Sequence, residues 1–250
     1  MHDISMHAIA LDDSRLLDTW DRAATVERPW RELVLLESAC GIPFETLAHL
    51  SVGERDRLLL AIRIGTFGAR LECETACPTC NARLQLALDA TQLLVPPRTV
   101  DASEFLLTDG EWAVRFRLPD STDLAACTPN GDGADAADVL ADRCMSAVRA
   151  AEEDVGGSAL PARLRERVVE RMSELDPQAD VSLNLNCAAC GHEWQSYFDP
   201  AAFLLSEIDG YAARLTGEVH RLARAYGWSE ASILEMSPVR RQRYLSLLLQ

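Results

Sequence analysis

Hydrophobic and polar residues follow two different periods along this 250-residue chain. Residues 1–70 and 199–250 repeat apolar side chains at helical spacing. Residues 71–90 and 181–198 instead alternate apolar and polar positions, as half-buried strands do. The pattern predicts an α+β protein in which helical N- and C-terminal regions flank two hairpins. One C-terminal helical face is predicted to collect Tyr211, Leu215, Val219, Leu222 and Tyr226.

The stretch between the two hairpins, residues 91–180, predicts an insertion with a hairpin of its own and several helices. Apolar residues alternate on both sides of Asp109-Gly110, a strong two-residue turn signal. Longer helices are predicted over 134–151 and 161–176 from their apolar spacing.

Several helix boundaries are marked by capping residues. Gly41 follows a Leu-rich run and is expected to end that helix. Ser51 and Glu54 form a capping box ahead of the next helix. Asp199-Pro200 places an N-cap residue before a proline at the first helical position. These signals fix where the predicted helices begin and end.

Two Cys-x-x-Cys pairs, Cys77/Cys80 and Cys187/Cys190, lie at the turns of the two hairpins. Four thiolates in two knuckles are the ligand set of a closed, tetrahedral structural zinc site. We therefore predict one structural Zn²⁺ per chain and a split zinc-ribbon-like β core. The alternative is two unrelated pairs of buried or redox-active cysteines.

The residue after each second cysteine is Asn81 or Gly191, the types that best tolerate a left-handed backbone. A turn that aims two sulfurs at one ion is expected to need that conformation there. Cys73, on the strand that enters the first knuckle, and His192, directly after the second, are the other candidate ligands.

Charge argues against nucleic acid as a partner. The net charge is −15, and the 24 basic residues are all arginine. Nucleic-acid binding depends on a basic surface that neutralises phosphates. The chain has no apolar run long enough to span a bilayer, and its N-terminus lacks a secretory signal pattern. Cysteines paired for metal then predict a cytoplasmic protein.

No catalytic motif emerges. The sequence lacks a nucleophile elbow, a dinucleotide-binding glycine pattern and the metalloprotease helix motif. A zinc deaminase needs a His-x-Glu element, whereas here His192 and Glu193 are adjacent. We therefore expect neither enzymatic activity nor a small-molecule substrate.

Three segments resemble one known family. They are LAHLSVGERD at 47–56, VRFRLP at 114–119, and EVHRLARAYGWSE at 218–230, the last running on to PVRR at 238–241. Together they resemble baseplate proteins of T-even-type phages and related contractile injection systems, among them the members that have zinc knuckles. The resemblance covers most of the chain in pieces.

The resemblance implies a structural role as a component or assembly factor of the baseplate, with other baseplate, tube or spike subunits as partners. The C-terminal aromatic and arginine residues are candidate contacts, because such residues are enriched at interface hot spots. These candidates are Tyr226, Trp228, Arg240 and Arg241. For the two rings, packing against the chain's own helices is the alternative. A zinc-ribbon regulator or adaptor that acts through protein contacts is the alternative function.

Overall fold

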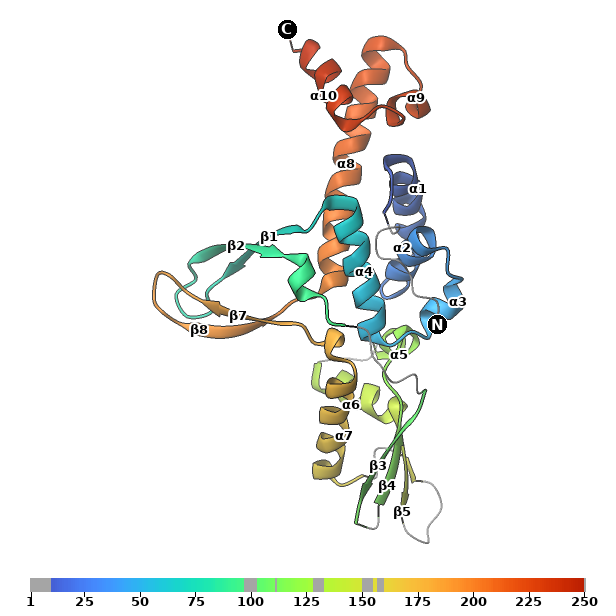
Figure 1. Cartoon of the computed structure of the whole chain (residues 1–250), viewed down its shortest axis with the longest axis vertical. Helices are drawn as coiled ribbons and strands as arrows, with labels where there is room; N and C mark the ends of the chain where they lie inside the picture. Colours follow the sequence, from blue (N-terminus) through green and yellow to red (C-terminus); the bar gives the residue numbers. More distant parts are fainter. Residues whose placement is uncertain are drawn as a thin grey trace.

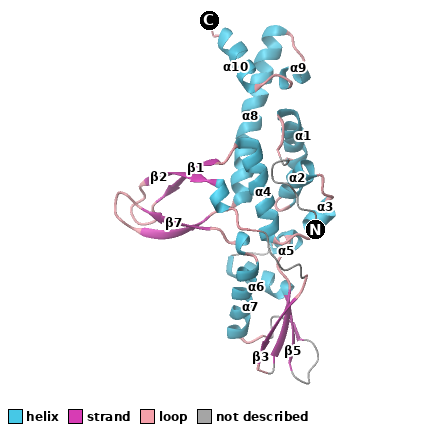
Figure 2. Cartoon of the chain, viewed as in Figure 1, coloured by secondary structure: helices cyan, strands magenta, loops and turns pink. Residues whose placement is uncertain are grey.

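The computed structural model describes residues 10–96, 103–110, 112–127, 133–149, 155–156 and 160–249. The molecule is elongated, with a helical body at its centre, one pair of hairpins projecting sideways, the insertion at one end and the C-terminal helices at the other (Figure 1). Small antiparallel sheets stand beside the helices, as in an α+β protein (Figure 2). The predicted α+β class is confirmed.

The helical body contains the largest hydrophobic core. Its members include Leu16, Leu33, Leu59 and Leu204, which are buried where α1, α2, α4 and α8 meet. The body consists of α1 (Asp13–Ala23), α2 (Trp30–Cys40), α3 (Phe44–Ala48), α4 (Val52–Phe67) and the N-terminal half of α8 (Pro200–Tyr226).

Predicted capping residues begin and end these helices. Gly41 adopts the left-handed conformation at φ 68° where α2 ends. The hydroxyl of Ser51 accepts a hydrogen bond from the backbone N–H of Glu54 at 3.2 Å. The Asp199 carboxylate accepts one from the N–H of Ala202 at 2.9 Å, so the predicted start of α8 is confirmed.

The four strands of the two knuckle hairpins form what we call the arm. β1 (Arg70–Ala76) pairs with β2 (Arg83–Asp89), and β7 (Ser182–Asn186) pairs with β8 (Glu193–Tyr197). Each pair is a separate two-stranded antiparallel sheet. A small apolar cluster fastens the base of the arm to α4, and its buried members are Leu60, Leu71, Ala90 and Phe198.

The arm corrects one expectation. The hairpins were predicted to form the core that the terminal helices flank. Instead, the helices form the main core and the hairpins project from it (Figure 1). The physical reason is the small apolar area of the hairpins. Strands β2 and β8 alternate half-buried with exposed positions, and β1 and β7 have one buried position each, so the two short hairpins bury little apolar surface.

The insertion has a hydrophobic core of its own, with Val114, Phe116, Leu164 and Val168 among its buried members. The hairpin predicted around Asp109-Gly110 is confirmed, because β3 pairs with β4. The strands are β3 (Phe105–Asp109), β4 (Trp112–Phe116), β5 (Met145–Arg149) and β6 (Val155–Gly156). The helices are α5 (Ser121–Cys127), α6 (Gly133–Cys144) and α7 (Ala162–Leu175), with two 3-10 turns at η2 (Ala90–Leu93) and η4 (Pro177–Ala179).

One helix prediction in the insertion is wrong and another is right. The helix expected over 134–151 ends at Cys144, and Met145–Arg149 continues as strand β5 against β4. Helical and strand periods are hard to separate over a short apolar run, and pairing with β4 decides between them. The helix expected over 161–176 is confirmed as α7.

The C-terminal end of α8, α9 (Glu230–Leu234) and α10 (Pro238–Leu247) make up the tip of the molecule (Figure 1). A third small core holds it together, formed by Val219, Leu222, Ile233 and Leu245. None of the helices that the structure describes combines the length and apolar character needed to cross a bilayer.

Candidate metal centre

The two Cys-x-x-Cys turns have the same backbone geometry. In the first, the N–H of Cys77 donates to the carbonyl of Ala82 at 2.9 Å, and the N–H of Asn81 donates back to the carbonyl of Cys77 at 2.9 Å. The second turn, which begins at Cys187, repeats both bonds between equivalent positions at 2.9 and 2.8 Å. Two unrelated sequences are therefore folded into matching knuckles.

The left-handed position predicted for each knuckle is confirmed. Asn81 has a φ of 59° and Gly191 a φ of 72°. Asn81 is the one non-glycine residue with positive φ in the described part of the chain. This conformation reverses the chain after the second cysteine, so both sulfurs of a knuckle point to the same side.

The four cysteine sulfurs come together at the end of the arm. All four Sγ atoms lie within 4.8 Å of one another. The Sγ atoms of Cys77 and Cys190 are 3.7 Å apart, and those of Cys80 and Cys187 are 3.6 Å apart. A Zn–S distance of about 2.3 Å puts the sulfurs of a regular tetrahedron about 3.8 Å apart, whereas a disulfide needs about 2.05 Å. The spacing fits a four-thiolate metal site.

Backbone groups already favour ionisation at part of this cluster. The N–H of Cys190 lowers the pKa of Cys187 to about 7. Burial raises the pKa of Cys77, but the backbone N–H groups of Cys80 and Thr79, together with the Cys80 thiol, outweigh it and lower that pKa overall. The N–H of His192 lowers the pKa of Cys190, but its neighbouring thiols outweigh this and raise the pKa to about 12. A divalent cation among the sulfurs would favour the thiolate at every position.

The two other candidate ligands lie outside this cluster. Among the described residues, the group with metal-ligand spacing consists of the four knuckle cysteines and includes neither Cys73 nor His192. Cys73 packs in the apolar cluster at the base of the arm. The His192 ring stacks on Trp194, with centroids 5.8 Å apart.

The candidate partner-binding residues at the tip divide into two kinds. The ring of Trp228 stacks on Tyr226 at 4.5 Å and meets Tyr244 edge-on at 4.8 Å, so three rings form one cluster. Arg240 is exposed. Arg241 requires a correction: it is 1% exposed and forms ion pairs within the chain, so it is not a surface contact.

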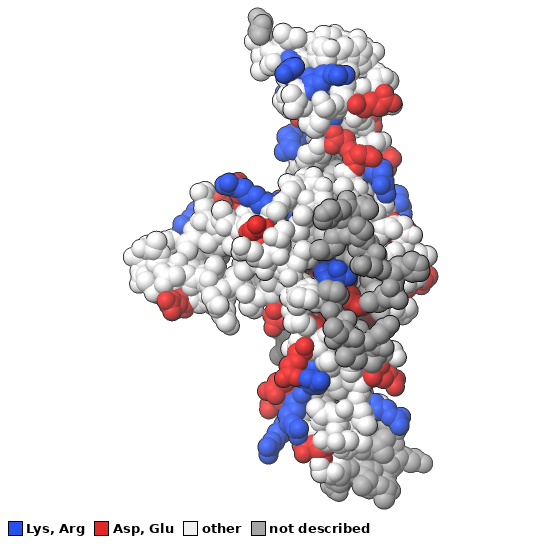
Figure 3. Space-filling view, in the orientation of Figure 1, with Lys and Arg blue, Asp and Glu red and all other residues white. Residues whose placement is uncertain are grey.

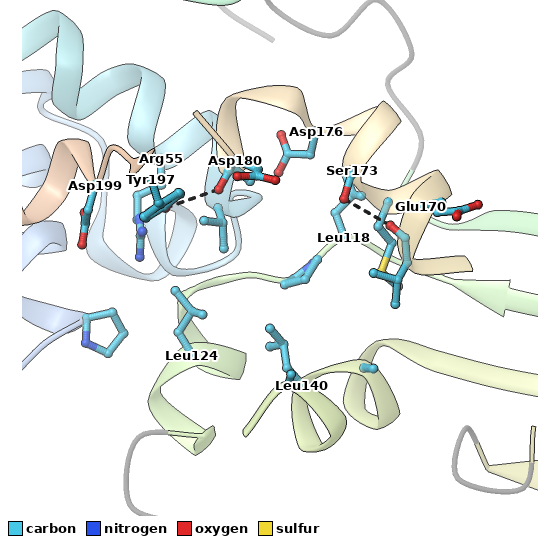
Figure 4. Close-up of a pocket in the computed structure, with 18 of the residues that line it drawn as sticks. Arg55, Leu118, Leu124, Leu140, Glu170, Ser173, Asp176, Asp180, Tyr197 and Asp199 are labelled. Atoms are coloured by element: carbon cyan, nitrogen blue, oxygen red, sulfur yellow. Dashed lines mark hydrogen bonds between the residues drawn. The ribbon is translucent and has the colours of Figure 1, made fainter. Parts of the chain in front are cut away.

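Sequence reasoning missed a large groove where the helical body, the insertion and β8 meet. Its volume is about 1010 Å³. In Figure 4, Leu124 and Leu140 lie on one side of the groove and Ser173 on the other, while Tyr197 lies at the end nearer Arg55 and Asp199. No local motif signals this groove, because its lining comes from seven separate elements and the loops between them.

Comparison with known families decides the assignment. The family model described as "T4 bacteriophage base plate protein" matches residues 35–205, more than half of the chain. The chain belongs to this family. Comparisons with curated proteins and with solved structures give no match.

The base plate match extends from α2 to the first turns of α8. It therefore includes the arm with both knuckles and all of the insertion, whereas α1, α9 and α10 lie outside it. The predicted family is confirmed.

Proposed function

We propose that this protein is a structural component or assembly factor of the baseplate of a contractile phage tail or a phage-tail-like injection system. The family match over residues 35–205 is the observation that supports this proposal most directly. We assign the protein no catalytic reaction. Its partners in this proposal are other baseplate, tube or spike subunits.

We propose that Cys77, Cys80, Cys187 and Cys190 hold one structural zinc ion. A bound Zn²⁺ would cross-link the two hairpins through its four Zn–S bonds. It would have no open coordination position for a substrate, because four thiolates complete the tetrahedron. The two sheets share the apolar cluster at the base of the arm but are not joined by strand pairing, so this cross-link would set their relative position at the end of the arm. Residues 71–90 and 181–198 then act as one zinc-stapled unit between the helical regions 1–70 and 199–250.

The shape supports a role in assembly. The arm, the insertion and the tip project from the helical body in three directions (Figure 1), which offers separate surfaces to several neighbouring subunits. At the tip we propose Tyr226, Trp228 and Arg240 as partner contacts, since aromatic and arginine side chains dominate interface energetics. Arg241 supports these contacts from within.

Deletion of the gene, followed by electron microscopy of particles from the host, tests this function. The proposal predicts that sheathed particles disappear or lack baseplates and that wild-type protein supplied in trans restores them. Normal numbers of complete, contractile particles in the deletion strain would contradict it.

A further inference from the structure

Exposed apolar side chains gather at two distant places on this molecule. Val169 and Tyr197, 43% and 55% exposed, line the groove. Val239 and Leu247, 65% and 55% exposed, lie on α10 at the tip. Exposed apolar residues that lie together mark interaction sites, which makes both places candidate contact surfaces.

The groove has an acidic wall along α7. Glu166 and Glu170 line it and have no ion-pair partner among the described residues. Asp180 adds a third exposed carboxylate. Glu32 also lines the groove, is 0% exposed, and keeps one carboxylate oxygen without a hydrogen bond in the described part of the chain.

The arginines of the groove do not offset this charge, because they are already paired. Arg28 bonds to Asp199 at 3.2 Å, and Arg55 to Asp56 at 2.7 Å. Arg165 lies 3.1 Å from Asp142. An occupant of the groove should therefore be apolar on one face and positively charged beside it.

Helix α10 has this composition. Its sequence, PVRRQRYLSL, contains three arginines and no acidic residue, in a chain whose net charge is −15. Arg241 points inward, whereas Arg240 and Arg243 are exposed. The outward face has a shallow hollow lined by Val239, Arg243 and their neighbours. Arginine side chains gather near this end of the molecule in Figure 3.

We propose that α10 of one copy of this chain binds in the groove of a second copy. Val239 and Leu247 would contact the apolar floor, and Arg243 would face the Glu166–Glu170 wall. The groove has a volume of about 1010 Å³, which is at the upper end of the range for pockets that bind small molecules. An amphipathic helix that lies in an apolar groove is a common mode of protein recognition.

The contact has consequences for assembly. It joins two different surfaces, so it is heterologous and generates a ring or an open chain of copies. This inference stands on charge and exposure alone and does not depend on the baseplate role.

Sedimentation velocity of the full-length protein over a range of concentrations tests the proposal. Wild type should self-associate, and Arg243→Glu or Glu170→Arg should each weaken association about tenfold or more, since like charges then face each other. Mixing these two variants should restore association, because the intact groove of the first meets the intact α10 of the second. Arg83→Glu, the same charge change on the arm, is the matched control and should associate like wild type.

Two outcomes would overturn the proposal. One is a wild-type protein that stays monomeric at every concentration. If Glu170→Arg then abolished binding of some other subunit, the groove would serve that different partner. The other is failure of the mixed variants to associate although circular dichroism shows each of them folded.

Discussion

The backbone N–H of Gly53 donates a hydrogen bond to the carboxylate of Asp176 at 2.9 Å. Gly53 lies in the first turn of α4, and Asp176 directly follows α7, so the bond joins the helical body to the insertion. A carboxylate at a helix N-terminus satisfies a free N–H and complements the helix dipole. The approach is close: a Cβ on residue 53 would lie 2.2 Å from Asp176 Oδ1.

Gly53→Ala is therefore expected to lower the free energy of unfolding by about 1–3 kcal/mol, since backbone or carboxylate must move to admit the methyl group. Gly210→Ala in α8 is the matched control. A Cβ there meets nothing within 4 Å, so alanine should stabilise the helix by about 0.5–1 kcal/mol. Urea unfolding of the two variants measures the difference. Equal effects would contradict the close contact between Gly53 and Asp176.

Asp123 is the charged centre of the insertion. It is fully buried and accepts hydrogen bonds from Arg117 at 2.8 Å and from Arg143 at 3.0 Å. Removal of one member of a buried ion pair leaves its partner uncompensated, so Asp123→Asn should cost about 3–5 kcal/mol of unfolding free energy. Asp138→Asn, at an exposed position of α6, should cost much less.

The same residue predicts a pH dependence. Burial raises the pKa of Asp123, but the hydrogen bonds from Arg117 and Arg143 and the charge of Arg117, together with the backbone N–H of Asp120, outweigh it and hold the pKa well below its usual range. The folded state therefore binds fewer protons here than the unfolded state, so the stabilisation is present above about pH 4 and lost as pH falls further. The difference between wild type and Asp123→Asn should shrink below about pH 4. A difference that stays constant or grows on acidification would contradict this.

The two adjacent arginines of α10 should contribute very differently to stability. Arg241 bonds to Asp13 at 2.6 Å and to Glu218 at 3.2 Å, which ties the tip to α1 and α8. Arg241→Ala should cost about 3–5 kcal/mol, because two carboxylates lose their buried partner. Arg240→Ala, at an exposed position, should change stability by about 0.5 kcal/mol or less. Thermal unfolding of both variants gives the comparison, and equal losses would show that Arg241 has no special internal role.

The knuckle cysteines predict a metal dependence confined to the arm. Cys80→Ser or Cys190→Ser should abolish bound zinc, whereas Cys40→Ser, outside the cluster, should retain it. Structural zinc contributes on the order of 10 kcal/mol to small modules, but the helical body has a separate core. Zinc loss should thus speed hydrogen exchange in β1, β2, β7 and β8 and leave α4 protected. Unchanged zinc content in both knuckle variants would contradict the four-thiolate site.

Local signals predicted much of the secondary structure and the grouping of the four cysteines. A capping residue such as Ser51 acts within one turn of helix, and the Cys-x-x-Cys spacing defines a knuckle. Both features can therefore be recognised from a few consecutive residues. The metal ligand set also places distant segments side by side, which single-sequence patterns seldom do.

Features that depend on distant packing were not predictable. Arg241 looks like a surface residue until Asp13 and Glu218 are brought to it by folding. The strand at Met145–Arg149 is chosen by its pairing with β4 and not by its own pattern. The groove exists only because the insertion folds back beside the body, so its lining has no sequence signature.

A structural component, unlike a transient assembly factor, stays in the finished baseplate. Density-gradient sedimentation of a native host lysate, with detection of this protein in each fraction, tests the proposed structural role most directly. The protein should co-migrate with large sheathed particles, at constant ratio to tube and sheath subunits. Presence of the protein solely in light fractions, in a lysate rich in complete particles, would contradict a structural place in the baseplate.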